Sequence, residues 1–387
     1  MAFYFDFDNW RTMLRLAWRE ESPRARRRYL LVLCLAVPVV ASFHALCFAL
    51  DPLLFPSLRR THMRAPVFVV GHARSGTTLI HRLLSRDAGR FSSFMLYELY
   101  FPSLLQKKLI RAAARFDAAV LGGFVARRVA AWEEKRYGAM RGTHTMGLTL
   151  HEEDDIIYYW SMASGFWITK MPWMGDLDFY SVNDWPEKKR RRLHAFYRAC
   201  VERQLVLNGP DKTHLSKNPI FAGRVASLIE SFPDARFVVP VRDPRETIPS
   251  LLKLVRMGWK ALGWDDEKQR RCLRILADQS VHTYMHPLEM LEAHPETKGS
   301  VVDYRDLTSD PAGAVRGIYA DLELPLTPAF EAELETLGKR AREHRATHTY
   351  SLEEFGLEAG EIESSLAGLF ERFGWANAEG ETSGDHG

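Results

Sequence analysis

Apolar residues in this chain follow two patterns, short continuous runs and longer stretches with a helical period. The runs at 66–70, 235–241 and 300–304 are typical of buried strands. Helical periodicity follows the first two runs, over about 77–86 and from Pro244 onward. This alternation predicts an α/β fold built on a central, mainly parallel sheet.

Further periodic stretches predict helices between these strands. A stretch rich in alanine and arginine covers 104–140, a helix with Pro186 at its first position runs to about Leu207, and another lies near 220–231. In parallel sheets of this kind ligands lie beyond the carboxyl ends of the strands. Binding residues are therefore expected just after the apolar runs.

The N-terminal region contains an uncharged apolar segment. No formally charged side chain stands between Tyr29 and Leu50, and four of the five residues at 24–28 are arginines. The segment fits a membrane span, a helix lying on a membrane surface, or a helix of the protein core. Pro38 and His44 interrupt it, so a surface-lying anchor is a credible alternative to a span. The predicted divisions are a lead-in at 1–28, an apolar anchor at 29–60, a folded domain at 65–375 and a disordered tail at 376–387.

The overall composition is that of a globular protein with a substantial core. Hydrophobic residues make up 46% and charged residues 26% of the 387 positions, and the formal net charge is only +3. This near balance gives no reason to expect nucleic acid as a partner, and the basic run at 188–192 is best interpreted as a solvated helix face. The four cysteines show neither a disulfide framework nor zinc spacing.

A glycine-rich loop follows the first apolar run, in the stretch GHARSGTT. Gly71 and Gly76 have the spacing of a phosphate-binding loop, and a following helix offers backbone N–H groups to an anion. Thr77 occupies the position at which ATPases and kinases carry lysine, and a basic residue, Arg74, stands inside the loop instead. A sulfuryl group carries less charge than a phosphoryl group, so a forked guanidinium without a metal ion suits it.

A second pair of polar residues follows the run at 235–241. Arg242 ends the strand and Ser250 lies about two turns into the next helix, so both side chains are able to face one crevice. An ion pair between Arg242 and a nearby carboxylate explains the arginine equally well when this motif is taken alone. The anion loop elsewhere in the chain favours a second anion site.

These motifs resemble those of sulfotransferases that use 3′-phosphoadenosine 5′-phosphosulfate. GHARSGTT is similar to the P-R-S-G-T-T loop of the tyrosylprotein, carbohydrate and bacterial branch, with Ala73 in place of proline. RFVVPVRDPRETIPSLL matches the family's Arg-x₇-Ser pair, and VVDYRDLTSDP resembles its Y-E-D-L-x-x-D-P block, with Arg305 replacing the acid. HTYSLEEFGL resembles the C-terminal signature. The resemblance covers about 65–375 and implies a P-loop NTPase-like three-layer fold with helix-rich insertions.

The resemblance also implies a role for each motif. The loop holds the 5′-phosphosulfate of the donor, with Arg74 also acting in catalysis, and Arg242 with Ser250 grips the 3′-phosphate. Lys217, in LSKNP, corresponds to a lysine that touches the phosphosulfate and assists departure of the leaving group. No metal ion is expected. The implied loop residues are Arg74, Ser75, Gly76, Thr77 and Thr78.

Two regions offer a base for the acceptor proton. Glu98, in LYELYFPS, lies where tyrosine-sulfating and carbohydrate-sulfating relatives carry a catalytic glutamate, and it is the first candidate. The second region is the run HEEDD at 151–155, in which His151 and Glu152 are the candidates. The structural alternatives are a capping or salt-bridged Glu98 and a solvated acidic helix start. The run lacks convincing metal-ligand spacing.

The acceptor is less well specified than the donor. Aromatic residues gather at 158–185, including Trp160, Trp167, Trp173 and Tyr180, where they suit a ring-containing acceptor or simply form core. We predict a sulfotransferase acting on a hydroxyl or amine of a lipid, glycolipid, carbohydrate or small molecule, associated with the cytosolic face of a membrane. A P-loop kinase or NTPase that requires Mg²⁺, and a membrane-tethered nucleotide-binding protein without turnover, are the alternatives.

Overall fold

The computed structural model describes residues 2–138, 146–341, 353–355 and 358–375. Within these residues the centre is a five-stranded sheet in the order β2-β3-β1-β4-β5, and its described strand pairs are all parallel. The strands are β1 (Val67–Val69), β2 (Phe91–Ser92), β3 (Thr213–Lys217), β4 (Arg236–Val241) and β5 (Gly299–Asp303). This sheet confirms the predicted α/β fold class.

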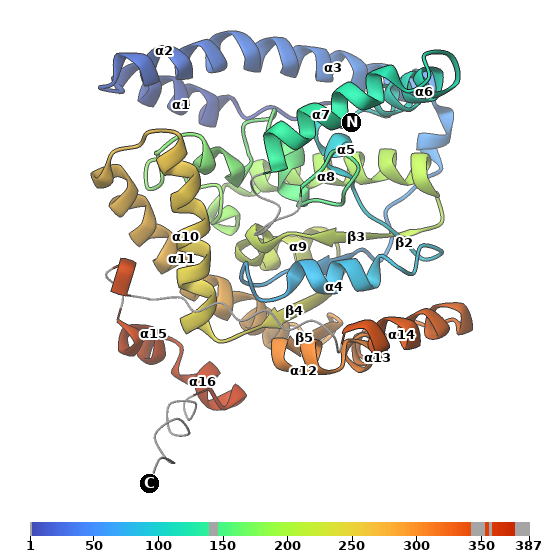
Figure 1. Cartoon of the computed structure of the whole chain (residues 1–387), viewed down its shortest axis with the longest axis vertical. Coiled ribbons are helices and arrows are strands. Elements are labelled where there is room, and N and C mark those ends of the chain that lie inside the picture. The colour runs from blue at the N-terminus through green and yellow to red at the C-terminus, as the bar shows by residue number, and fades with distance from the viewer. Residues whose placement is uncertain (1, 139–145, 342–352, 356–357, 376–387) are drawn as a thin grey trace.

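Helices cover both faces of the sheet and make the three predicted layers (Figure 1). One face carries α8 (Glu187–Asn208), α9 (Val225–Ser231), α10 (Pro244–Ala261) and α11 (Asp266–Ala293). The other face carries α4 (Thr77–Leu84), α12 (Tyr304–Ser309), α13 (Pro311–Asp321) and α14 (Pro328–Ala341). Two short helices, α15 (Ala359–Ser365) and α16 (Ala367–Phe373), follow near the C-terminus.

The two cores on either side of the sheet arise from the alternation of side chains along each strand. In β1, Phe68 points into the core beneath α8 and α9, whereas Val67 and Val69 point into the core beneath α4 and α13. All three side chains are fully buried. A strand covered on both faces reads as a continuous apolar run, which is why the sequence predicted this strand.

Two strands were not predicted, and β3 is the more important of them. Its sequence THLSK contains one aliphatic residue, Leu215, and is otherwise polar. It nevertheless lies inside the sheet, with His214, Ser216 and Lys217 all buried. Hydrophobic periodicity does not detect such a strand, because its buried positions are stabilised by polar partners rather than by apolar contacts.

A further helical layer lies above the sheet domain. It contains α1 (Phe7–Arg19), α2 (Pro23–Leu31), α3 (Val37–Leu54), α5 (Leu96–Tyr100), α6 (Leu104–Val120) and α7 (Phe124–Tyr137) (Figure 1). A π-helical segment, Val32–Ala36, joins α2 to α3 and immediately precedes Pro38, which has no N–H to donate to the preceding turn. The apolar N-terminal segment is thus one long helix.

The aromatic segment is largely core. Trp167 and Trp173 are buried against Met13, Tyr29 and Leu33, so they attach the first helices to the body of the protein. The core interpretation of these two tryptophans is therefore confirmed. The expected disordered tail at 376–387, and most of the HTYSLEEFGL block, lie outside the described residues.

Candidate functional site

The candidate site lies at the carboxyl edge of the sheet, where adjacent parallel strands end. Pairing sets Lys217, the last residue of β3, beside Val69, the last residue of β1. The Asn218 N–H donates to the Val69 carbonyl over 3.0 Å, and Arg242 directly follows β4 on the other side of β1. Three segments far apart in sequence therefore converge at the expected edge.

The loop after β1 depends on two glycines with positive φ. Gly71 has φ +126°, and a Cβ there would lie 2.9 Å from the Pro240 carbonyl oxygen. Gly76 has φ +99°, and a Cβ there would lie 2.9 Å from the Tyr304 ring. The loop backbone thus approaches β4 and α12 more closely than any side chain allows.

This loop leads directly into the N-terminus of α4. The N-cap residue of α4 is Gly76, which has no side chain to bond the first turn. The backbone N–H groups of that turn, and the partial positive charge of the helix N-terminus, therefore face the loop. Ser75 is buried and donates its hydroxyl to the His72 carbonyl (2.6 Å), while Thr77 is buried and Thr78 half-buried. The loop is thus held by a hydrogen bond within itself, and it precedes a helix N-terminus of the kind that binds anions.

Arg74 connects the two predicted anion motifs. Its Nε donates to the Ser250 hydroxyl over 3.1 Å, and Arg242 Nη1 donates to the Arg74 carbonyl over 3.5 Å. Arg74 has φ +72°, a conformation that costs a residue other than glycine about 1–3 kcal/mol and is concentrated at functional sites. The backbone of this strained residue aims its guanidinium across the loop.

Arg242 has both a stacking and an ionic partner. Its guanidinium lies 4.3 Å from the centroid of the Tyr304 ring and pairs with Glu246, four residues further along. The Tyr284 hydroxyl donates to the Arg242 carbonyl over 2.7 Å and fixes the backbone. The carboxylate partner foreseen as the alternative is therefore present. Because Glu246 is half exposed, this pair is open to competition from a ligand anion.

Lys217 is buried and faces the acidic run. Its Nζ lies 3.8 Å from Glu152 Oε2 and 3.7 Å from Glu153 Oε1, and the residue is 1% exposed. Two carboxylates thus balance one ammonium group beside the root of the anion loop. This pairing places the leaving-group candidate and a base candidate at one spot.

The description of this acidic run as a solvated helix start was wrong. Glu152, Asp154 and Asp155 are all less than 4% exposed, and residues 154–158 form a buried 3₁₀ turn. Asp154 accepts from His214 (2.9 Å) and from Tyr197, and Asp155 pairs with Arg224 (2.9 Å). Burial raises the pKa of Asp155, opposed by the Arg224 charge. These acids are buried because each meets a cation or a hydrogen-bond donor.

His81 is a residue that the sequence analysis did not single out. It is buried on α4, contacts the Ser93 hydroxyl from Nε2 (3.1 Å), and lies edge-on to His151, with ring centroids 5.6 Å apart. Burial, followed by the nearby Lys217 charge, holds its pKa well below the ordinary value. His81 is therefore close to both Lys217 and the exposed His151. Its place four residues after Thr77 on a sheet-facing helix was the available signal.

Glu98 lies apart from these groups in its contacts. It is fully buried, caps α5 by accepting from the Met95 N–H (3.0 Å), and pairs with Arg111 (3.1 Å). Asn208 donates to the same carboxylate over 3.3 Å. These partners correspond to the capping and salt-bridged alternative. The role of Glu98 as a base stays a prediction.

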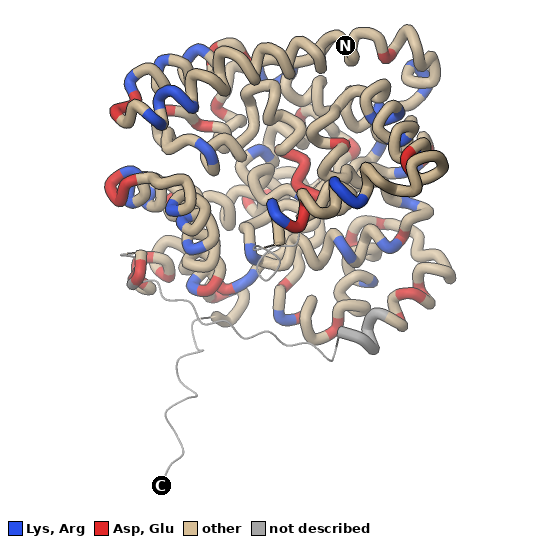
Figure 2. The backbone as a smooth tube through the Cα atoms, turned by 45° about the horizontal axis from the view of Figure 1, so that its top comes forward, with Lys and Arg blue, Asp and Glu red and all other residues tan. Residues whose placement is uncertain are grey.

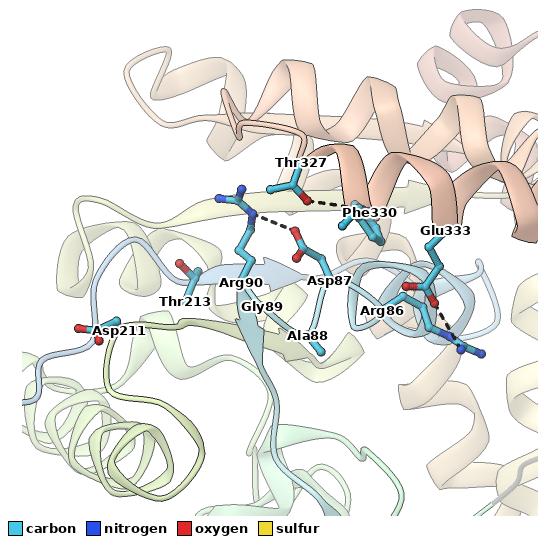
Figure 3. Close-up of a pocket in the computed structure, with 11 residues that line it drawn as sticks. Arg86, Asp87, Ala88, Gly89, Arg90, Asp211, Thr213, Thr327, Phe330 and Glu333 are labelled. Carbon is cyan, nitrogen blue, oxygen red and sulfur yellow. Dashed lines mark hydrogen bonds and ion pairs between the residues drawn. The ribbon is translucent and has the colours of Figure 1, made fainter.

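The opposite edge of the sheet carries a separate hollow of about 530 Å³ (Figure 3). Arg90 and Thr213 border it at the start of β2 and β3, and Glu333 of α14 closes one side with Arg86. Strand amino ends are not where ligands bind in such sheets. The convergence of polar groups, rather than this hollow, therefore identifies the site.

Comparison with known proteins agrees with this geometry. Residues 66–328 match the model of the sulfotransferase family, which is more than half of the chain. The chain belongs to the sulfotransferase family. This assignment confirms the resemblance drawn from the motifs and makes the protein a sulfotransferase enzyme. It replaces the two alternatives, a P-loop kinase or NTPase and a nucleotide-binding protein without turnover.

Named relatives and solved structures extend the match. The sulfotransferase is 26% identical over 318 residues to omega-hydroxy-beta-dihydromenaquinone-9 sulfotransferase Stf3 of Mycobacterium bovis and of Mycobacterium tuberculosis, covering 80% of this chain and 75% of theirs. The structure of STF9 from Mycobacterium avium is similar with a TM-score of 0.70 and 21% identity, covering 96% and 93%. STF1 from M. tuberculosis gives 0.66 and 19%, covering 94% of both chains. These two structures confirm the fold.

Proposed function

We propose that this sulfotransferase takes its sulfuryl group from 3′-phosphoadenosine 5′-phosphosulfate and transfers it to a hydroxyl group of a lipid-like acceptor. The observation that carries the proposal is the contact between the two anion motifs. Arg74, Ser250 and Arg242 meet at the end of β1, although they lie up to 176 positions apart in sequence. A ligand with an anionic group at each end suits this arrangement.

The two anion motifs, the loop before α4 and the pair Arg242 and Ser250, bind different ends of the donor. The 5′-phosphosulfate lies on the N-terminus of α4, bound by its backbone N–H groups, Thr77, Thr78 and Arg74. The 3′-phosphate takes the place that Glu246 now fills at Arg242, beside the Ser250 hydroxyl. Replacement of a half-exposed carboxylate by a phosphate costs little, because the surface ion pair that is lost contributes at most about 1 kcal/mol.

The transfer step needs a proton acceptor and a cation. The acceptor oxygen forms a bond to sulfur while the bond between sulfur and the bridging phosphate oxygen breaks, and its electrons leave with 3′-phosphoadenosine 5′-phosphate. Lys217 stabilises the negative charge on that leaving oxygen. The acceptor proton passes to a base in the segment 151–153, where Glu152 lies 3.8 Å from Lys217 and His151 is exposed.

We place the base in this segment rather than at Glu98. The two glutamates are equally buried, but their partners differ. Glu98 is bonded to Met95, Arg111 and Asn208, which leaves its carboxylate committed to the junction of α5, α6 and α8. Glu152 instead faces the lysine at the carboxyl edge of the sheet.

Two observations support a lipid-like acceptor. The relatives with 26% identity are named for a hydroxylated menaquinone derivative. This chain also contains one helix, Pro23–Leu54, that is long and apolar enough to cross a membrane. An enzyme on the cytosolic face of a membrane has access both to a donor made in the cytosol and to an acceptor in the bilayer.

Transfer of label from ³⁵S-labelled donor tests the proposal. The purified protein, incubated with hydroxylated isoprenoid quinones or with a total lipid extract, is expected to move label into the organic phase without added Mg²⁺. Arg74→Ala strongly reduces this transfer, whereas Arg270→Ala, at an exposed arginine of α11, leaves it unchanged. Label that stays in the aqueous phase with every lipid, but appears on a soluble sugar or peptide, contradicts the acceptor class.

A further inference from the structure

The long N-terminal helix has an outward face that is apolar along most of its length. Only 28% of its most apolar 18-residue window is buried, so it is not a core helix. From Leu31 to Leu46 its exposed large residues recur every three or four positions, as expected of one helix face. The exposed large residues of the whole helix are Leu31, Leu35, Val39, Phe43, Leu46, Leu53 and Leu54, which are between 51% and 72% exposed.

The inward face of the same helix is mainly apolar, with Leu33, Val37 and Phe48 buried, and two polar residues on it tie the helix to the body of the protein. Asp51 is fully buried, and it accepts from Arg203 Nε (2.6 Å), the Ser103 hydroxyl (2.9 Å) and the Leu105 N–H (2.8 Å). About two turns earlier, His44 is 1% exposed and contacts the Gln106 amide, with Nδ1 2.9 Å from Nε2. A charge and an imidazole are therefore held within the protein, opposite the apolar face.

The hairpin of α6 and α7 presents a second apolar face beside the first. α6 packs against α3, and α7 packs against α6. Figure 1 shows the long helix (α2 and α3) and the hairpin of α6 and α7 on the side of the molecule away from α12–α14. The exposed large residues of the hairpin are Leu109, Phe116, Val120, Leu121, Phe124, Val125, Val129 and Trp132. We call these residues, together with the outward face of the long helix, the docking surface.

Charge along the docking surface is mostly basic. At 23–54 and 101–132 every exposed charged side chain is basic, and the acids in these ranges, Asp51 and Asp117, are buried; the exposed acids Glu21 and Glu134 lie just beyond these ranges. The Asp117 carboxylate caps the N-terminus of α7, where it accepts hydrogen bonds from the Val125 and Ala126 N–H groups. Figure 2 shows the basic residues gathered at one end of the long helix. The exposed basic residues are Arg24, Arg26, Arg27, Arg28, Lys108, Arg115, Arg127 and Arg128.

We propose that this docking surface lies flat on an anionic phospholipid bilayer and that the long helix does not span it. Apolar side chains enter the boundary between headgroups and acyl chains, and the surrounding arginines and lysines meet lipid phosphates. The proposal is independent of the donor and the acceptor, because it concerns a face of the molecule and not the sheet edge.

The contacts of Asp51 and His44 argue against a span. A helix that crosses the bilayer has to leave α6 and α8, which strips Arg203 from Asp51 and brings both groups into hydrocarbon. The alignment with the M. avium structure covers 96% of this chain, so it must extend into the 32-residue helix. The helix is thus part of the shared fold body. A bilayer is favoured over a second copy of the chain because opposed copies would bring like charges together.

Vesicle flotation of the full chain tests the proposal. Vesicles of phosphatidylcholine with phosphatidylglycerol are expected to carry the protein to the top of the gradient, and phosphatidylcholine alone to carry much less. Leu35→Asp with Phe43→Asp, and separately Phe116→Asp with Trp132→Asp, should each weaken partitioning by about tenfold or more. Met257→Asp is the matched control, since Met257 is 57% exposed on α10, away from the docking surface.

Each other outcome overturns the proposal. Membranes from expressing cells that retain the protein after alkaline carbonate extraction indicate a span. Failure of the wild-type chain to float, or equal flotation of the docking-surface variants and Met257→Asp, removes the bilayer as the partner. A stable dimer that Leu35→Asp with Phe43→Asp dissociates, together with no flotation, assigns the face to a second copy. Thermal unfolding verifies that each variant is folded. Because the two double variants lie on different helices, the test remains valid if one of them does not fold.

Discussion

The carboxyl edge of the sheet and the N-terminal helical layer use polar residues in opposite ways. At the sheet edge, Arg74 and Arg242 lie within reach of solvent and have partners that a ligand is able to replace. In the helical layer, Asp51 and His44 point inward and make permanent contacts, while apolar side chains face out. We propose that the first arrangement binds an anion; the second holds a helix in place.

This difference explains why the function of one region is predictable from sequence, whereas the role of the other requires the structure. Spacing and residue type are enough to predict an anion loop, because phosphate and sulfate groups need backbone N–H groups and fixed cations. Composition alone leaves the 22-residue uncharged segment from Tyr29 to Leu50 open to three interpretations. Only the direction of its polar side chains distinguishes them.

The largest effect is expected at the sheet edge. Arg74→Ala should lower kcat/KM for sulfuryl transfer by about 100- to 1000-fold, since a guanidinium aimed at the transferred group is lost. Arg74→Lys, which keeps the charge but not the fork, should recover part of that loss. Steady-state kinetics with the labelled donor measure both variants, and activity within threefold of wild type in Arg74→Ala would contradict the assignment.

The next effect compares two buried glutamates. Glu152→Gln should lower kcat by about 100-fold with little change in the KM for donor, as expected for a lost general base. Glu98→Gln should leave kcat within a few-fold of wild type and instead lower the melting temperature, because it weakens the pair with Arg111. The opposite result, with Glu98 controlling kcat, would restore Glu98 as the base.

Stability should change most in the helical layer when Asp51 is altered. Asp51→Asn leaves Arg203 buried without its charge partner and is expected to cost about 3 kcal/mol in the free energy of unfolding. Urea denaturation monitored by circular dichroism measures this. Asp265→Asn, at a half-exposed N-cap of α11, is the control and should cost about 0.5 kcal/mol or less, because asparagine caps a helix about as well as aspartate.

The smallest effect depends on pH. Burial lowers the pKa of His44 from 6.5 to about 4, so the unfolded chain binds this proton before the folded chain does. Protonation of His44 therefore does not affect folding stability above pH 6.5. As pH falls from about 6.5 to about 4, it lowers the free energy of unfolding by roughly 2–3 kcal/mol. His44→Gln should flatten the denaturation free energy over this window. A slope unchanged by the substitution would contradict a buried neutral imidazole.

The sequence predicted the fold class and the positions of the motifs well where apolar or glycine patterns decide the structure. Gly71, Gly76 and the run at 235–241 are of this kind, because the turn and the covered strand each require one residue type. The helix start at Pro244 was predicted for the same reason. The local chemistry of these residues leaves few alternatives.

Features that depend on distant partners were not predictable from one sequence. Nothing near His214 or Lys217 indicates a strand, since the partners that allow their burial, Asp154 and Glu152, lie about sixty residues away. The same holds for Glu98, whose capping and ionic contacts come from α5, α6 and α8. Polar burial is set by tertiary contacts, which periodicity does not report.

The central claim is that two cationic clamps at one sheet edge hold both ends of a doubly phosphorylated adenosine. Isothermal titration with 3′-phosphoadenosine 5′-phosphate and with AMP tests it most directly, in the wild-type chain and in Arg242→Ala. We expect the first ligand to bind about 100-fold more tightly than AMP without Mg²⁺, and Arg242→Ala to remove most of that preference. Equal affinity for the two ligands, or tighter binding of ATP with Mg²⁺, would contradict the claim.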